Sequence, residues 1–221
     1  MLRCVKHSRD IMRRKPDSRR KQSLLPVVRK AFVEQPVEKL CMLELAKRSG
    51  VSLWALRYSF ENGDVLFREV MQDLVRTVSA KCRYPHLAQA SVVETIRSFA
   101  DFTAALVSSA EYRDLLYLIL RYGRYHRWLE EAYQQNVVKK LHEELELAVM
   151  RAGQRGGRTV LFRNGAVRNF HRSIETEFGL APLLHADSDR SPEGSARVLS
   201  GVAAEAFGAT YLFQWEPASA A

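Results

Sequence analysis

The stretch RSGVSLWALRYSF, residues 48–60, has the pattern of a turn followed by a short helix. The residues before it, 42–47, place apolar side chains at helical spacing, and Gly50 can end that first helix in the left-handed conformation. Ser52 can cap the second helix, because its side-chain oxygen can accept a hydrogen bond from a first-turn amide. Two short helices joined by a glycine-containing turn are typical of a helix-turn-helix.

The apolar spacing in the second helix predicts which of its faces is buried. We expect three side chains to face inward: Ala55, Leu56 and Phe60. This rotation leaves five side chains facing outward: Ser52, Leu53, Trp54, Arg57 and Tyr58. An alternative for Trp54 is that its ring packs on the preceding helix or on the N-terminal segment.

Two further helices are expected to flank this pair. The first begins at Ser23 as its N-cap, carries apolar residues at helical spacing through Phe32, and ends before Pro36. A longer helix starts near Asp64 and ends in the segment 81–86, which contains a proline. The head and a larger body are expected to meet along this longer helix.

Residues 1–22 carry nine lysines or arginines against two aspartates, and so account for +7 of the net charge of +9. Self-repulsion predicts a flexible arm, and its charge favours a polyanion, either nucleic acid or an anionic membrane face. The alternatives are a solubilising tail and a start codon placed too early. Arg19, Arg20 and Lys21 end the arm, next to the first helix.

The remaining sequence predicts a helical body. Val92 to Leu106 forms an amphipathic stripe, the apolar run 115–120 favours a fully buried helix, and residues 125–152 favour a long helix in which His142 faces solvent. Residues 159–170 fit either a helix or a hairpin that turns at Asn164-Gly165. The last helix, residues 193–214, is rich in small residues, so it either lies deep in the body or packs against a symmetry mate.

Residues 24–70, about a fifth of the chain, resemble the DNA-binding head of the TetR family of bacterial transcriptional regulators. The similarity runs through the first helix, residues 24–32, the second helix and turn, LAKRSGVS at 45–52, the recognition helix at 56–60, and Asp64-Val65-Leu66. Three positions depart from the family pattern. Arg57 stands where a tyrosine is common, Gly63 where a lysine is usual, and Cys41 where serine or threonine normally caps the second helix.

The resemblance implies that the outward face of the recognition helix meets DNA. Arg57 can donate to guanine or phosphate, and Leu53 and Trp54 can touch thymine methyl groups or sugar edges. Basic residues next to such a head reach a minor groove or flanking phosphates. The predicted DNA-binding residues are Arg19, Arg20, Lys21, Lys47, Ser52, Leu53, Trp54, Arg57 and Tyr58.

The resemblance also implies an all-helical body that binds a small-molecule effector and forms a homodimer. Aromatic residues of the body are candidates to line an apolar pocket, although any single one can equally be a core residue. The predicted ligand-binding residues are Phe99, Phe102, Tyr117, Tyr122, Tyr125, His126 and Trp128.

The sequence therefore predicts an all-α protein: a basic arm (1–22), a helix-turn-helix head (23–68), and a ligand-binding and dimerisation domain (69–221). The expected function is DNA-binding transcriptional regulation, as a repressor that a small-molecule effector releases from a palindromic double-stranded operator. The alternative is a helical interaction or sensor module whose head no longer reads DNA. No nucleophile–base pair, metal spacing or glycine-rich cofactor loop is present in the sequence, so no enzyme activity, metal or cofactor is expected.

Apolar residues make up 47% of the chain, but no apolar run approaches the roughly 18 residues that a membrane span requires. The N-terminus lacks the apolar core of a secretory signal, and three widely spaced cysteines favour reduced thiols. We therefore expect a cytoplasmic protein without a membrane partner.

Overall fold

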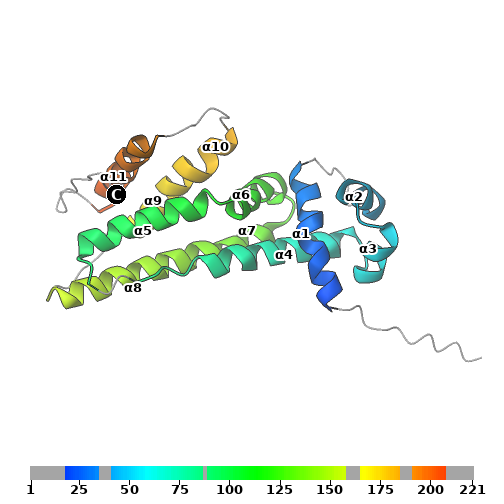
Figure 1. Ribbon diagram of the computed structural model, residues 1–221, viewed down its shortest axis with the longest axis horizontal. Helices are drawn as coiled ribbons and strands as arrows, with labels where there is room; N and C mark the ends of the chain where they lie inside the picture. Colours follow the sequence, from blue (N-terminus) through cyan, green and yellow to red (C-terminus); the bar gives the residue numbers. More distant parts are fainter. Residues whose placement is uncertain (1–17, 35–40, 87–88, 158–164, 185–190, 208–221) are drawn as a thin grey trace, which may run out of the picture. The chain divides into compact units, whose positions relative to one another are not determined.

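The computed structural model describes residues 18–34, 41–86, 89–157, 165–184 and 191–207. The chain divides into two compact units, residues 1–70 and residues 71–221. All regular elements of the described residues are helices (Figure 1), which confirms the predicted all-α class. Among the helices described, none combines the length and apolarity needed to cross a membrane.

The first helix of unit 1, α1, spans Ser18–Glu34 and so begins five residues earlier than predicted. Ser23 is not an N-cap: its hydroxyl donates back to the carbonyl of Arg20 inside the helix. Arginine, lysine and glutamine are good helix formers, and Lys21 is held by an ion pair with Glu69. The last residues of the predicted flexible arm are therefore helical, and residues 1–17 lie outside the described residues.

The predicted helix-turn-helix is confirmed in detail. α2 spans Met42–Ser49, and Gly50 follows it with a φ of 67°, the left-handed conformation that a glycine adopts at little cost. α3 spans Leu53–Ser59, and the Ser52 hydroxyl accepts a hydrogen bond from the Ala55 amide at 3.2 Å. Local capping therefore fixes where both helices end and begin.

The core of unit 1 is formed by apolar side chains from all of its helices. α4 spans Gly63–Lys81 and continues past the boundary at residue 70. Its first turn is capped by the Asn62 side-chain oxygen, which accepts from the Val65 amide at 2.9 Å. Within unit 1, Phe67 of α4 meets Phe32 of α1 edge to face at 5.4 Å between ring centroids. Other fully buried members are Val28, Leu45, Leu56 and Leu66.

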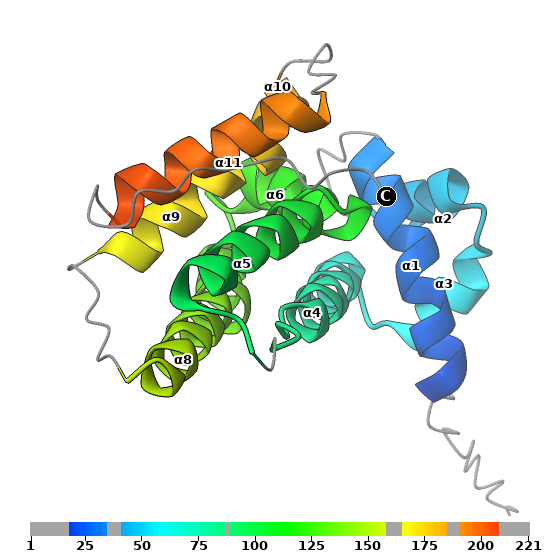
Figure 2. The same cartoon turned by 60° about the vertical axis from the view of Figure 1, so that its left-hand side comes forward.

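Unit 2 is built on α5, which spans Val92–Val107 and starts with a reciprocal capping box between Ser91 and Glu94. Helix α5 packs against α8, α9 and α11 (Figure 2). α6 spans Ala110–Tyr122 and ends at Gly123, as expected for a helix-breaking glycine. The prediction that this helix is fully buried is wrong. Leu120 is 60% exposed, whereas Leu115, Leu116 and Leu118 are buried. The apolar run there covers more than one helical face.

The long helix expected at 125–152 is a continuous helical run of three parts. α7 spans Arg127–Tyr133, a π-helical stretch η1 spans Gln134–Val138, and α8 spans Lys139–Arg155. Each π turn holds more residues than an α turn, so it widens the helix locally.

A second run of the same kind follows. α9 spans Ala166–Ile174, a π-helical stretch η2 spans Glu175–Leu180, and α10 spans Ala181–Leu184. Of the two alternatives for 159–170, the helix is correct for 166–170, and residues 159–164 lie outside the described residues. Gly165 has a φ of 81° and precedes the first turn of α9, so this glycine starts a helix and does not form a hairpin turn.

The last helix, α11, spans Pro192–Phe207, and residues 208–214 of the predicted helix lie outside the described residues. Its apolar face is buried inside the chain itself: Ala203 is 0% exposed, and Leu199 is also buried. α11 packs on α9 and α5. The burial of Ala203 therefore agrees with the first of the two environments predicted for this helix, in which the helix lies deep in the body.

Candidate functional site

The rotation predicted for α3 is confirmed by side-chain burial. Ala55 and Leu56 are buried, as is Phe60 just after the helix. Trp54 is 64% exposed, Tyr58 is 39% exposed, and Arg57 is exposed. Most of the Trp54 surface is therefore exposed among the described residues, and residues 1–17 of the N-terminal segment, on which the alternative places this ring, lie outside them. We call Trp54, Arg57 and Tyr58 the outer face of α3.

The two aromatic rings of the outer face lie against each other. Trp54 and Tyr58 are four residues apart, so they lie on one side of the helix. Their rings are stacked, with centroids 5.2 Å apart and planes 12° from parallel. The guanidinium of Arg20 lies 5.8 Å from the Trp54 ring centroid, within range of a cation–π contact. The stack gives α3 a flat, partly rigid surface next to a positive charge.

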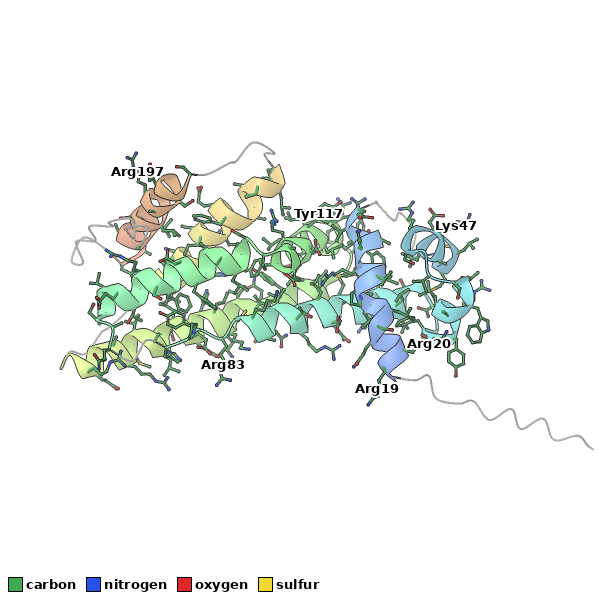
Figure 3. All side chains as sticks on the ribbon, in the orientation of Figure 1. Arg19, Arg20, Lys47, Arg83, Tyr117 and Arg197 are labelled. Atoms are coloured by element: carbon green, nitrogen blue, oxygen red, sulfur yellow. The ribbon has the colours of Figure 1, made fainter. Side chains whose placement is uncertain are left out.

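Further cations lie at the surface of unit 1. Arg19 and Arg20 are exposed in the first turn of α1, and Lys47 is exposed near the end of α2 (Figure 3). Lys21 differs from them: its ammonium pairs with Glu69 and lies 5.2 Å from the Phe60 ring centroid. This internal ion pair makes Lys21 less available to an external phosphate than its neighbours. Ser52 is exposed, and Leu53 is half-buried.

Two departures from the family pattern have clear local consequences. Gly63 is buried as the first residue of α4, so this position offers no cation. Cys41 is the N-cap residue of α2, and its thiol makes no capping hydrogen bond. The backbone amide of Glu44, and then that of Leu43, lowers the pKa of this exposed thiol. These amides lower the thiol's pKa without a capping hydrogen bond to it, so a serine hydroxyl at this position would be a better acceptor for them. Cys41 and Cys82 are both free thiols.

The predicted ligand-binding residues of unit 2 lie in different surroundings. Phe99 is a buried core residue whose ring meets Tyr84 at 5.0 Å and the half-buried Phe102 at 5.8 Å. The hydroxyl of Tyr117 accepts a hydrogen bond from Arg121 at 2.9 Å. For these residues a ligand contact stays a prediction, as it does for the others of the set: Tyr122, which is buried, Tyr125, which is exposed, and His126 and Trp128, whose rings meet at 6.3 Å.

A cleft of about 850 Å³ in unit 2 was missed by the sequence interpretation. None of the seven predicted residues lines it. Its walls come from η1 and the first turns of α8 on one side, and from α9 and the start of η2 on the other. The charged or titratable lining residues are Lys139, His142, Glu146, Arg168, His171, Arg172 and Glu175. The prediction that His142 faces solvent is wrong, because the side chain is half-buried in this cleft.

A buried polar cluster lies beside the cleft. The hydroxyls of Tyr112 and Tyr133 both donate to Oε1 of Glu175, and they lie 2.8 Å from each other. The Tyr112 hydroxyl is also 3.4 Å from Nε2 of His171. Burial above all raises the pKa of both tyrosines, so they remain hydrogen-bond donors at neutral pH.

The imidazoles of His142 and His171 meet edge to face at 5.3 Å between ring centroids. Burial lowers the pKa of His171 to about 4, and burial, together with the neighbouring His171 and Arg168, lowers the pKa of His142 to about 4. Both rings are therefore neutral near pH 7. Among the described residues, no group of histidines, cysteines and carboxylates is arranged to hold a metal ion.

Comparison with solved structures identifies proteins of the same fold. A candidate TetR-family transcriptional regulator from Mesorhizobium loti is 15% identical, with a TM-score of 0.58 over 86% of this chain and 95% of the other. A candidate transcriptional regulator from Streptomyces coelicolor A3(2) is 20% identical, with a TM-score of 0.56 over 86% of this chain and 98% of the other. No family model and no curated protein sequence matches the chain.

The solved structures span nearly their whole length in the match, so the likeness covers the helical body as well as the head. This structural likeness agrees with the family resemblance that the sequence shows at residues 24–70. The chain therefore has the all-helical fold of a TetR-family transcriptional regulator.

Proposed function

We propose that the protein is a DNA-binding transcriptional regulator whose α3 enters the major groove of a palindromic operator. The outer face of α3 is the observation that carries the proposal. A helix that only packed against its neighbours would have no need to present a tryptophan, an arginine and a tyrosine together to solvent. Here Trp54 is mostly exposed while the residues that follow it, Ala55 and Leu56, are buried. Single exposed apolar residues are ordinary, but contiguous apolar surface, such as the stacked rings of Trp54 and Tyr58, often marks an interaction site.

The chemistry of the outer face suits DNA. The Arg57 guanidinium can donate two hydrogen bonds to a guanine or bind a phosphate, and the flat stack of Trp54 and Tyr58 can lie against thymine methyl groups or sugars. Arg19, Arg20 and Lys47 add exposed positive charge in the same unit, which supports contact with flanking phosphates. These contacts compensate for the lysine that Gly63 replaces.

The remaining parts of the proposal are a homodimer, a small-molecule effector and repression. A homodimer would present two copies of α3 to half-sites about one helical turn, or a multiple, apart. An effector that binds unit 2 would favour a state in which the two heads no longer match that spacing. The protein would then repress transcription in the cytoplasm until the effector releases it.

A gel shift on the intergenic DNA beside the protein's own gene, run at two stated salt concentrations, tests the proposal. We expect a shifted complex whose affinity falls steeply as salt rises, because bound cations displace the counterions of DNA. Arg113 of α6, an exposed arginine of unit 2, provides the control variant Arg113→Gln, which should bind as the wild type does. Undetectable binding, or binding that salt does not affect, would favour a helical interaction or sensor module instead.

A further inference from the structure

The cleft of unit 2 is lined by three cations, Lys139, Arg168 and Arg172, and by two carboxylates, Glu146 and Glu175. Arg168 and Arg172 are one turn apart on the same face of α9, and both are exposed. Lys139 lies on the opposite wall and makes only a long ion pair of 3.8 Å with the exposed Glu143. Within the described residues, neither Arg168 nor Arg172 has an ion-pair partner. Three positive charges thus border the cleft, and two of them have no carboxylate partner.

The inner side of the cleft offers polar groups that are neutral or negative. Glu175 accepts both tyrosine hydrogen bonds on Oε1, so its other oxygen is available. Nε2 of His142 is buried and has no hydrogen-bond partner among the described residues. A buried polar atom without a partner is costly, and a ligand or water that bonds to it removes that cost.

The backbone of both walls departs from α-helical geometry at the cleft. Gln134, Gln135 and Val138 of η1 line one wall, and Glu175, the first residue of η2, lines the other. π-helical turns are rare and occur frequently at functional sites. Two such turns that contribute to one cleft are a second indication, independent of charge, that the cleft binds a ligand.

The composition of the described lining favours a polar occupant over a lipid-like or aromatic one. Among the described residues, the only apolar side chains that line the cleft are Val138 and Val167, and none of the described phenylalanines, tyrosines or tryptophans does so. An apolar ligand would gain few apolar contacts here, and it would leave the buried Nε2 of His142 without a hydrogen bond, which is unfavourable. The apolar effector site expected from the sequence therefore does not correspond to this cleft.

We propose that the cleft binds a small organic or inorganic anion through Arg168, Arg172 and Lys139, with a polar group of the ligand facing Glu175 and His142. The ligand class is a carboxylate- or phosphate-bearing molecule. A planar guanidinium binds either group through two parallel hydrogen bonds, and the lysine adds a point charge. The binding of an anion in this cleft does not depend on the proposed function. Only the further step, in which this anion is the effector of the regulator, rests on that function.

Isothermal titration calorimetry on the full chain, in the absence of DNA, tests the proposal. The probes are citrate, succinate and inorganic phosphate, with neutral succinamide as the uncharged control. We expect saturable binding of at least one anion, no binding of succinamide, and weaker binding at higher salt. Arg168→Gln and Arg172→Gln should each weaken that binding about tenfold, because each removes a charge-assisted hydrogen bond.

A matched double variant, Arg83→Gln with Arg113→Gln, removes two exposed charges of unit 2 that do not line the cleft. It should bind the anion as the wild type does. Lys139→Gln on the opposite wall provides a second test if either arginine variant fails to fold. The proposal is overturned if none of the three anions binds, or if the cleft variants and the control double variant bind equally well.

The two proposals fail separately. Anion binding by a chain that gives no gel shift would leave the cleft proposal standing and remove the regulator. A salt-dependent gel shift by a chain that binds none of the anions would do the reverse. Where both hold, adding the bound anion to the gel shift should weaken the DNA complex, and this effect should disappear in Arg168→Gln.

Discussion

The substitution Arg57→Ala tests the role of the outer face of α3 in DNA binding without changing the side chains that α3 packs into the core of unit 1. The Arg57 side chain is exposed, so its removal should change the free energy of unfolding by no more than about 0.5 kcal/mol. The effect of this substitution on the free energy of DNA binding should be larger. A good contact between an arginine and a base is worth about 1–3 kcal/mol for each head, so a homodimer that loses two such contacts should bind at least about thirtyfold more weakly.

Fluorescence anisotropy with a labelled operator fragment, at several salt concentrations, distinguishes the two kinds of contact. If Arg57 binds phosphate, the slope of log affinity against log salt should become shallower by about 0.9 for each head. If Arg57 reads a base, the slope should change little while discrimination between sequences falls.

Leu56→Ala provides the opposite pattern, because Leu56 is 0% exposed. It should lower the free energy of unfolding by about 2–5 kcal/mol, which is a large part of the stability of a small helical unit. DNA binding would then be lost through unfolding, visible as reduced helical circular dichroism. An Arg57→Ala protein with wild-type affinity and an unchanged salt slope would refute the role given to the outer face.

Three further predictions concern stability. Cys41→Ser should raise the free energy of unfolding by about 1 kcal/mol in urea titrations, because serine is a good N-cap acceptor, and an unchanged midpoint would contradict this. Ala203→Glu should unfold the chain, since it buries a carboxylate, whereas the exposed Ala204→Glu should not; a stable Ala203→Glu protein in thermal melts would be the contrary result. As the pH falls from 6.5 to about 4, the unfolded chain protonates His171 before the folded chain does. Below pH 6.5 the free energy of unfolding should therefore fall by about 1.4 kcal/mol per pH unit. If His171→Gln leaves this pH dependence unaltered, His171 is not its cause.

The head could be predicted because its signals are local. Gly50 and Ser52 fix the turn through capping that involves residues close in sequence, and Ala55 and Leu56 fix the rotation of α3. The start of α1 was placed five residues too late because the charge of the segment before Ser23 was taken to exclude a helix. In the structure, helix propensity and the distant Glu69 outweigh that repulsion.

The cleft could not be predicted, because it joins residues that are far apart in sequence. Lys139 and His142 come from one helical run and Arg168 from another, and each fits the polar face of an ordinary surface helix. No single-helix pattern shows that two polar faces oppose each other. The regular helical spacing of apolar residues through η1 likewise gives no sign of a π-helical turn, because Tyr133 and Val137 are four residues apart and both are buried.

The central claim is that two copies of α3 read an operator. Hydroxyl-radical footprinting of the wild-type protein on the DNA beside its own gene tests this claim most directly. We predict two protected segments related by two-fold symmetry, with centres one helical turn or a multiple apart. Protection should be lost in a protein in which Trp54, Arg57 and Tyr58 are all replaced by alanine. Uniform cleavage along the fragment, or a footprint that the triple variant retains, would contradict the claim.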